Sequence, residues 1–586
     1  MDAFVQPLYE LADFDAIIRQ LKKPGIVQVS GCLDSQKAHF TNGLLREFPF
    51  RLIVAENDLK AKAFYEDFRL YDPEVLYYPA RDLIFYQADI HGNLLTRQRI
   101  QVLRALLERE EVTIVTSIDS CLDCLVPLAV WKEKVIKIRN DSEIDLDRMK
   151  RHLVELGYEW AAQVEVPGQF SIRGGIMDVF SLTEDNPWRI ELWGDEVDSI
   201  RSFDAESQRS IENLEEITIY PATEVVLDKE TVRQGIKAIE KEAQKSQKKF
   251  RDEMKTEEGA RVRQIAAELK DQLEEMEHIA GAESFVRYFY KKTESLLEYL
   301  PENTLVVIDE PNRLTEHAKT TEEEFRESMI HRLEKGYLLP GQMEVIRNHQ
   351  EVVHRFHQMH TLSLSTMEPR GTGWNFTMEM QLTVKSVNPY NNSFEMLVKD
   401  LLRWKKSGYR MLLLSPSRTR AARLAKDLQD QELSAFYSED PEELIQPGQI
   451  KVTWGRVSRG FEYPMVKYVV ISETDIFGKE KKKKRKKSQY SGKQIQSFSE
   501  LSVGDFVVHE NHGLGVYRGI EKMEVDGVVK DYIKIEYAGK SNLYILATQL
   551  DVLQKYAGSD AAKTPKLNKL GGQEWKKTKT KVRGAV

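Results

Sequence analysis

Short apolar runs rich in β-branched residues recur along this chain and alternate with helical patterns. Each run has the length of a strand that is buried on both faces of a parallel sheet. Helical stretches, such as residues 59–68 and 96–107, flank the runs, which is typical of an α/β fold with crossover helices. The runs stand at residues 51–56 (RLIVAE), 112–117 (VTIVTS), 305–310 (LVVIDE), 411–415 (MLLLS) and 468–473 (YVVISE).

Four stretches depart from this pattern. Residues 144–222, with the glycine pair Gly174-Gly175 and a strand pattern at Trp188–Trp193, indicate an α+β domain inserted into the α/β core. Residues 229–276 are charged and helical, as expected of a solvated helical face. Residues 479–487 read KEKKKKRKK and begin a linker, for which a flexible tether is favoured over a DNA contact. Residues 501–553 hold short strand patterns between turn dipeptides, which predict a small antiparallel β-barrel.

The composition limits the class of protein. The length of 586 residues predicts several domains, and the net charge of −8 restricts any nucleic-acid contact to local basic patches. There is no apolar run of membrane-spanning length, no secretory signal, and only three cysteines, so we expect a cytoplasmic protein with no membrane partner. Cys121 and Cys124 form a single CxxC pair. Buried thiols are favoured over a redox motif, and no metal site is predicted because zinc needs four ligands.

A strand pattern at residues 25–29 runs toward a helix where an ATP-binding P-loop would lie. The working pattern GxxxxGK[ST] supplies glycines around the phosphates, a lysine for their charge and a hydroxyl for Mg²⁺. Here Gln28 and Leu33 replace the glycines, Asp34 replaces the lysine, and only Ser35 fits. Asp34 would repel phosphates, and Lys37 lies three residues late and is expected to point elsewhere on the helix. We predict a degenerate loop, no catalytic residue and no cofactor in this segment.

Two further features are typical of helicase-type enzymes. Asp309 and Glu310 follow a strand and resemble an acidic pair that holds Mg²⁺, but without phosphates to bridge they are interpreted as a relic at a helix start. Arg456 and Arg459 resemble helicase arginines, but we expect no competent first lobe to face them, so a spacer role is favoured for their domain.

Several segments are distinctive enough to indicate a family. Residues 168–180 read GQFSIRGGIMDVF, residues 188–204 read WRIELWGDEVDSIRSFD, and residues 504–519 read GDFVVHENHGLGVYRG. Together with residues 51–68, 96–118 and 531–546, they resemble the N-terminal half of the bacterial transcription-repair coupling factor (Mfd) family, over essentially the whole chain. The first two segments are similar to a domain shared with the repair protein UvrB, and the third to an RNA-polymerase-interaction domain.

The resemblance implies a RecA-like/UvrB-like P-loop α/β core, an inserted α+β domain, a second α/β half-lobe and a small Tudor/CarD-like antiparallel β-barrel. The implied domains are the core at residues 1–143, a UvrA-binding insert at 144–222, the second part of the core at 223–365, an α/β spacer at 366–478, a basic linker at 479–498, an RNA-polymerase-interaction barrel at 499–556, and the start of a helix toward an absent translocase at 557–586.

The resemblance also implies that the insert recruits UvrA, with Arg173, Arg189 and Trp193 at the matching positions. Arg189 and Trp193 lie four residues apart in one strand pattern, so both are expected on the same face. By its residue type alone Trp193 favours a core position, and the resemblance reverses that expectation. In the family a C-terminal domain masks this face. That domain is missing here, so we expect an open face.

For the barrel, the resemblance implies docking on the β subunit of RNA polymerase stalled at a DNA lesion. Met523 is the position carried over as an apolar anchor, with Val516 and Arg518 beside it. ATP, Mg²⁺ and most contact with double-stranded DNA are assigned to the absent translocase half. The alternative is a UvrB-type ATP-dependent DNA helicase or damage-verification subunit, which would need a working P-loop and a long Tyr-rich hairpin. Residues 77–97 are short for such a hairpin and hold few aromatics.

Overall fold

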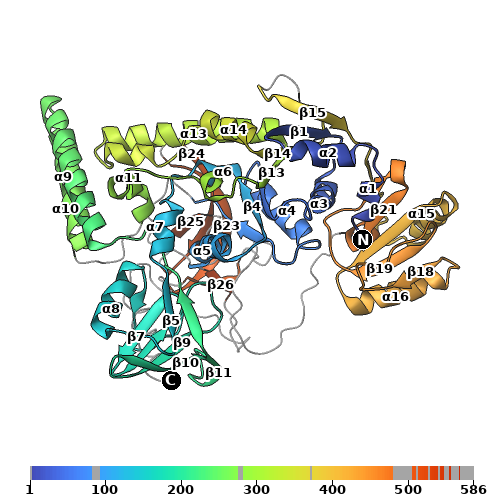
Figure 1. The fold of residues 1–586 in the computed structure, drawn as a ribbon. Helices are drawn as coiled ribbons and strands as arrows, with labels where there is room; N and C mark the ends of the chain where they lie inside the picture. Colours follow the sequence, from blue (N-terminus) through green and yellow to red (C-terminus); the bar gives the residue numbers. More distant parts are fainter. Residues whose placement is uncertain are drawn as a thin grey trace.

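The computed structural model describes residues 3–81, 93–274, 281–369, 373–478, 504–509, 513–525, 528–538, 542–546, 553–555 and 567. The strands of these residues form five sheets (Figure 1). The predicted linker at residues 479–498, nearly all of the connecting segment at 557–586 and most of the aromatic stretch at 77–97 lie outside the described residues. Among the described helices, none is long and apolar enough to cross a membrane.

A parallel seven-stranded sheet forms the α/β core, as predicted. Leu52 and Val54 belong to one hydrophobic cluster and Ile53 to another, because neighbouring residues of a strand face opposite sides. Burial on both faces explains why these strands are continuous apolar runs. In their order across the sheet, the strands are β15 (Phe376–Gln381), β1 (Gly25–Ser30), β14 (His360–Ser365), β13 (Leu305–Asp309), β2 (Phe50–Ala55), β4 (Val112–Ser117) and β3 (Leu76–Tyr78).

The core extends beyond the expected boundary at residue 365. β15 pairs in parallel with β1, so the sheet ends at Gln381. Half-buried and exposed residues alternate along β15, as in an edge strand, which explains why no apolar run marked it.

Helices cover both faces of the core sheet. Side chains of α5 (Asn93–Glu108), α13 (Pro311–Glu334) and α14 (His349–Gln358) pack in one cluster, and those of α2 (Phe14–Leu21), α3 (Asp34–Asn42) and α4 (Asp58–Phe68) pack in the other. Shorter helices occupy the connections: α1 (Gln6–Tyr9), α6 (Ile118–Leu122), α7 (Leu128–Glu133), α11 (Val286–Phe289) and α12 (Leu296–Tyr299).

The inserted domain contains a six-stranded sheet and helix α8 (Leu146–Glu155). β5 (Ile136–Arg139) pairs with β12 (Glu216–Ile219), which brings the entry and exit of the insert together. The insert therefore begins near residue 136, before the expected boundary at 144. Across the sheet its strands are β11 (Ser210–Leu214), β10 (Glu196–Phe203), β9 (Trp188–Trp193), β8 (Ile176–Val179), β7 (Gln169–Arg173) and β6 (Glu159–Trp160).

Helices α9 (Lys229–Asp252) and α10 (Thr256–Glu274) form an antiparallel hairpin at one end of the molecule (Figure 1). The predicted helical content of this charged stretch is confirmed. The two helices also have a buried face, on which Val232, Ile239 and Phe250 of α9 pack in one cluster with Val262 and Leu269 of α10.

A second α/β lobe follows the core, and its sheet carries helices α15 (Phe394–Lys406) and α16 (Arg418–Gln429), with α17 (Glu473–Phe477) at its end. Leu412 and Tyr468 of this lobe lie in the same hydrophobic cluster as Val27 and Phe40 of the core, so the two lobes pack against each other. Across its sheet the strands are β16 (Lys385–Ser386), β20 (Phe461–Tyr463), β21 (Tyr468–Ser472), β17 (Arg410–Ser415), β19 (Ile450–Trp454) and β18 (Ala435–Tyr437).

The fifth sheet is antiparallel, as the turn dipeptides predicted. Closure into a barrel stays a prediction, because the described strands form an open order from β25 to β26. In that order they are β25 (Asn542–Leu546), β24 (Val528–Glu536), β23 (Gly513–Val525), β22 (Phe506–His509) and β26 (Leu553–Lys555).

Candidate functional site

The residues expected to bind UvrA lie on two strands of the inserted sheet. Arg173 ends β7, and Arg189 and Trp193 lie on β9. Along β9, Trp188 and Ile190 are buried whereas Arg189 is half-buried and Trp193 is exposed. Because this alternation places residues of one parity outside, Arg189 and Trp193 share a face, as expected.

A buried carboxylate between these strands holds both arginines. Asp178 of β8 has a side chain that is 1% exposed, and its oxygens accept hydrogen bonds from Arg189 Nε at 2.8 Å, Arg189 Nη2 at 2.9 Å and Arg173 Nη2 at 2.9 Å. The Arg189 guanidinium also lies 4.4 Å from the centre of the Phe203 ring. These hydrogen bonds to Asp178 raise the pKa of Arg189. Arg189 is thus fixed by a forked ion pair, which restricts it more than a solvated arginine.

The two arginines differ in what they present to a partner. The Arg173 side chain is 51% exposed and that of Arg189 only 18%, so Arg189 mainly supports the face and Arg173 reaches outward. Trp193 is 85% exposed, the most solvated tryptophan among the described residues. Sequence reasoning missed Asp178. Its place in the apolar run IMDVF concealed it, although the strand alternation with Met177 and Val179 puts it on the outer face.

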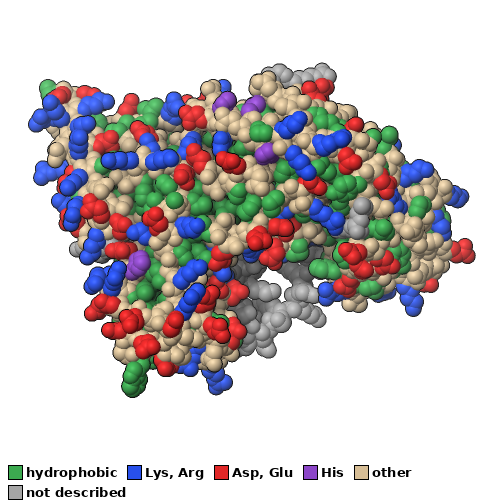
Figure 2. Space-filling view, viewed as in Figure 1, with side chains coloured by type: hydrophobic (Ala, Val, Ile, Leu, Met, Phe, Trp, Pro, Cys, Tyr) green, Lys and Arg blue, Asp and Glu red, His purple; other side chains and the backbone are tan. Residues whose placement is uncertain are grey.

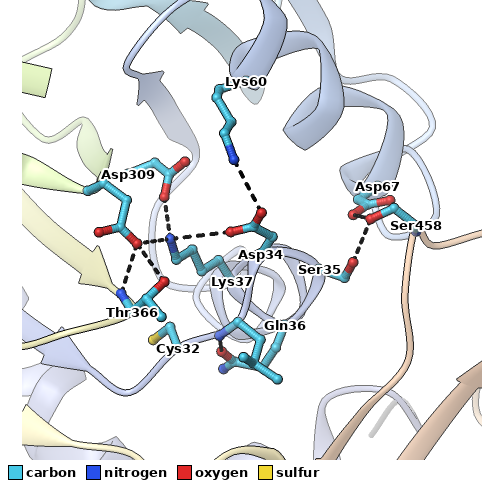
Figure 3. Close-up of polar contacts among 12 residues, drawn as sticks. Cys32, Asp34, Ser35, Gln36, Lys37, Lys60, Asp67, Asp309, Thr366 and Ser458 are labelled. Carbon is cyan, nitrogen blue, oxygen red and sulfur yellow. Dashed lines mark hydrogen bonds and ion pairs between the residues drawn. The ribbon is translucent and has the colours of Figure 1, made fainter. Parts of the chain in front are cut away.

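The expected degenerate phosphate loop connects β1 directly to α3 through Gly31, Cys32 and Leu33. Gln28 is buried and donates a hydrogen bond to the Ser365 hydroxyl at 2.7 Å. Asp34 begins α3, but its side chain is 71% exposed and lies 3.3 Å from Lys60. The Asp34 carboxylate also lies 3.9 Å from Lys37 Nζ, so it faces two lysines, and their charges offset the repulsion that it would exert on phosphates (Figure 3).

Lys37 fills the site, so the expectation that it points elsewhere is wrong. Its side chain is 1% exposed, and Nζ lies 2.6 Å from Asp309 Oδ1 and 2.7 Å from Glu310 Oε1 (Figure 3). Burial alone would lower the pKa of Lys37, but the two carboxylates outweigh it and raise that pKa. Burial disfavours ionised Glu310, yet Lys37 lowers the pKa of Glu310 below its usual value.

The acidic pair Asp309 and Glu310 therefore has a structural role. Asp309 and Glu310 hold an internal cation where an ATP-binding loop would need them for Mg²⁺. Glu310 also accepts hydrogen bonds from the backbone N–H and the hydroxyl of Thr366, at 2.8 and 2.7 Å. With Lys37 already on these carboxylates, the residues present do not fit Mg²⁺ and ATP.

Ser35, the only residue that matches the P-loop pattern, contacts the second lobe. Its hydroxyl lies 2.7 Å from the Ser458 hydroxyl and accepts a hydrogen bond from the Arg459 backbone N–H at 3.1 Å. Ser458 also donates to Asp67 of the core, from its backbone N–H at 2.6 Å and its hydroxyl at 2.8 Å. The segment with Arg456 and Arg459 thus does face a first lobe, one whose phosphate loop is closed by side chains.

Two parts of the chain match known domain families. Residues 136–225 match the UvrB interaction domain, which starts at β5, as the insert does. Residues 501–557 match the CarD-like/TRCF RID domain, which covers the fifth sheet. The transcription-repair-coupling factor of Bacillus subtilis (strain 168) is 34% identical over 594 residues, covering 100% of this chain and 50% of that protein. The chain matches half of a transcription-repair-coupling factor.

Alignments with other transcription-repair-coupling factors also cover about half of the relative. Those of Staphylococcus haemolyticus (strain JCSC1435) and Staphylococcus epidermidis (strain RP62A) are 31% and 30% identical, and each alignment covers 96% of this chain and 47% of the relative. The chain thus spans about half the length of the curated relatives it matches. The resemblance expected from the sequence is confirmed.

The three positions carried over to the RID domain have different surroundings. Val516 is 8% exposed, so its side chain offers little surface to a partner. Arg518 is exposed and pairs with Glu536 at 2.9 Å. Met523 lies in β23 opposite Lys530, and its side chain is outside the described residues.

Cys121 and Cys124 are buried free thiols, as favoured from their context. Burial raises the pKa of the Cys124 thiol, which keeps it in its unreactive protonated form. In the described ranges, no group of three or more His, Cys, Asp or Glu side chains is arranged to hold a metal ion.

Proposed function

We propose that this chain is the docking half of a factor for transcription-coupled nucleotide excision repair. Its insert recruits UvrA, and its RID domain docks on the β subunit of an RNA polymerase that has stalled at a DNA lesion. ATP-driven translocation on double-stranded DNA, with its Mg²⁺, belongs to the half of the relatives that this chain does not cover.

The observation that carries the UvrA proposal is the exposure of Trp193 beside two arginines on a preformed face. Burying a tryptophan stabilises a complex strongly, and Trp and Arg dominate interface energetics. Trp193 is 85% exposed, so it contributes little packing within this chain. Asp178 fixes the neighbouring guanidinium before a partner arrives, which lowers the ordering cost of binding.

UvrA capture by the whole chain tests this interface. Trp193→Ala and Arg173→Ala should each weaken UvrA binding about tenfold or more, as expected for interface anchors. Trp160→Ala is a matched control, because Trp160 is 57% exposed on the edge strand β6 of the same sheet. Wild-type UvrA affinity for Trp193→Ala, or equal losses for the two tryptophan variants, would contradict the assignment.

Polymerase docking is tested separately by co-purification with the β subunit. Met523→Asp should abolish retention of that subunit while UvrA capture persists. Arg518→Ala should weaken retention without unfolding the sheet, because Arg518 is exposed. Retention of the β subunit by both variants at the wild-type level would refute docking through this part of β23.

The rival function, a UvrB-type ATP-dependent helicase, requires this chain to bind nucleotide. Lys37 on Asp309 and Glu310 supports the docking role instead, because the internal ammonium replaces the nucleotide and its cation. Thermal unfolding with and without Mg²⁺–ATP distinguishes the two, since a ligand that binds the folded state raises the unfolding temperature. If Mg²⁺–ATP raises the unfolding temperature of the wild-type chain and of Lys37→Ala equally, the helicase function is favoured.

A further inference from the structure

A basic groove runs along the helical hairpin of α9 and α10, away from the residues of both docking proposals. The groove has a volume of about 540 Å³. Its lining includes the four cations Lys248, Arg251, Lys255 and Arg263, and no aspartate or glutamate. Figure 2 shows many Lys and Arg side chains over this hairpin, at the upper left of the molecule. The groove is thus a local basic patch on a chain whose net charge is −8.

Two cations of the hairpin that do not line the groove are held in ion pairs. Arg261 and Lys270 pair with hairpin carboxylates, at 3.4 and 2.9 Å. Lys248, Arg251 and Arg263 are exposed, and within the described residues they have no ion-pair partner. Lys255 pairs with Glu253 at 2.9 Å. Three unpaired cations that line one groove repel each other, and an anionic ligand would relieve that repulsion.

The rest of the lining indicates which anion fits. Gly259 and Ala260 leave room between the cations, and the lining contains no aromatic side chain. Single-stranded nucleic acid is held by aromatic stacking, and protein interfaces depend on aromatic anchors, so both occupants fit less well. Gln244 to Arg251 spans about 10 Å of helix, close to three phosphate-to-phosphate steps of about 3.4 Å along one strand of a duplex.

We propose that this groove binds the phosphate backbone of double-stranded DNA, without reading its sequence. Contact between this hairpin and DNA goes beyond the two docking roles, which use the insert and the RID domain. Loss of DNA binding at the groove would leave UvrA capture and polymerase docking unaffected. Loss of either docking role would in turn leave DNA binding at the groove unaffected.

The test is duplex DNA binding by the whole chain, measured by fluorescence anisotropy over a series of salt concentrations. The groove variant carries Lys248→Gln, Arg251→Gln and Arg263→Gln. The control variant carries Lys237→Gln, Lys241→Gln and Lys245→Gln, three exposed lysines of α9 that do not line the groove. Both variants lose three positive charges, so any contribution of the basic residues at 479–487 is common to both.

The groove variant should lower the slope of log affinity against log salt by about three, since each phosphate contact contributes about 0.9. The control variant should change that slope by less than about one. Equal changes in the two variants would overturn the proposal. So would polyglutamate competing as well as duplex DNA at equal charge, because the groove would then be a site for acidic polypeptides. Unchanged thermal unfolding of both variants confirms that they fold.

Discussion

Replacing Lys37 with methionine tests whether the internal ion pair closes the former nucleotide site. The substitution keeps most of the side-chain volume and removes the ammonium between Asp309 and Glu310. Those two carboxylates have side chains that are 11% and 20% exposed, so they would lose their counter-ion in a mostly buried place. Removing one partner of a buried ion pair costs about 3–5 kcal/mol, and we expect a loss at the lower end of that range.

Hydrogen exchange followed by mass spectrometry measures this loss locally, which matters because a chain of several domains does not unfold in two states. Amides of β1 and β13 should lose about 100-fold in protection, since 1.4 kcal/mol is tenfold. Lys60→Met is the control, because Lys60 and Asp34 form an exposed pair worth about 0–1 kcal/mol.

A compensating variant distinguishes charge from packing. Lys37→Met combined with Asp309→Asn and Glu310→Gln removes all three charges, so most of the lost protection should return, to within on the order of 1 kcal/mol of wild type. Lys37→Met protection within about 1 kcal/mol of wild type would refute the reasoning. The reasoning would also be refuted if the triple variant showed no more hydrogen-exchange protection than Lys37→Met.

Three further outcomes follow from the structure. Burial lowers the pKa of His39 from 6.5 to about 4, so its neutral form stabilises the fold above pH 6.5 and that stability is lost as pH falls from 6.5 to 4. Hydrogen exchange of the α3 amides should show a loss of protection on the order of 3 kcal/mol in this window that His39→Leu lacks; identical pH profiles would disprove it. Trp193→Ala should change the local stability of the insert by less than about 0.5 kcal/mol, since Trp193 is exposed, and a larger loss of hydrogen-exchange protection in β9 would show a packing role. Arg189→Ala should destabilise the insert by about 3 kcal/mol because Asp178 loses a forked partner, so hydrogen exchange of β8 that matches wild type would argue against this support.

Much of the fold follows from local patterns. The strands near residues 51–56, 112–117, 305–310, 411–415 and 468–473 were predictable within a residue or two, because a strand buried on both faces needs a continuous apolar run. β15 was missed for the same reason, since an edge strand keeps polar residues on its open face. The similarity to transcription-repair-coupling factors was also readable, because it rests on segments contiguous in the chain.

The sequence by itself determined that the phosphate loop lacks its glycines and its lysine. Only the tertiary structure decided what occupies that place. Lys37 and Asp309 are 272 residues apart in the chain and meet because β1 and β13 both flank β14 in one parallel sheet. Asp178 lies only 5 and 11 residues from Arg173 and Arg189 in the chain, and it meets both because β8 pairs with β7 and β9. Sequence patterns report the burial of each residue's own element, whereas pairs of opposite charge depend on which elements the fold brings together.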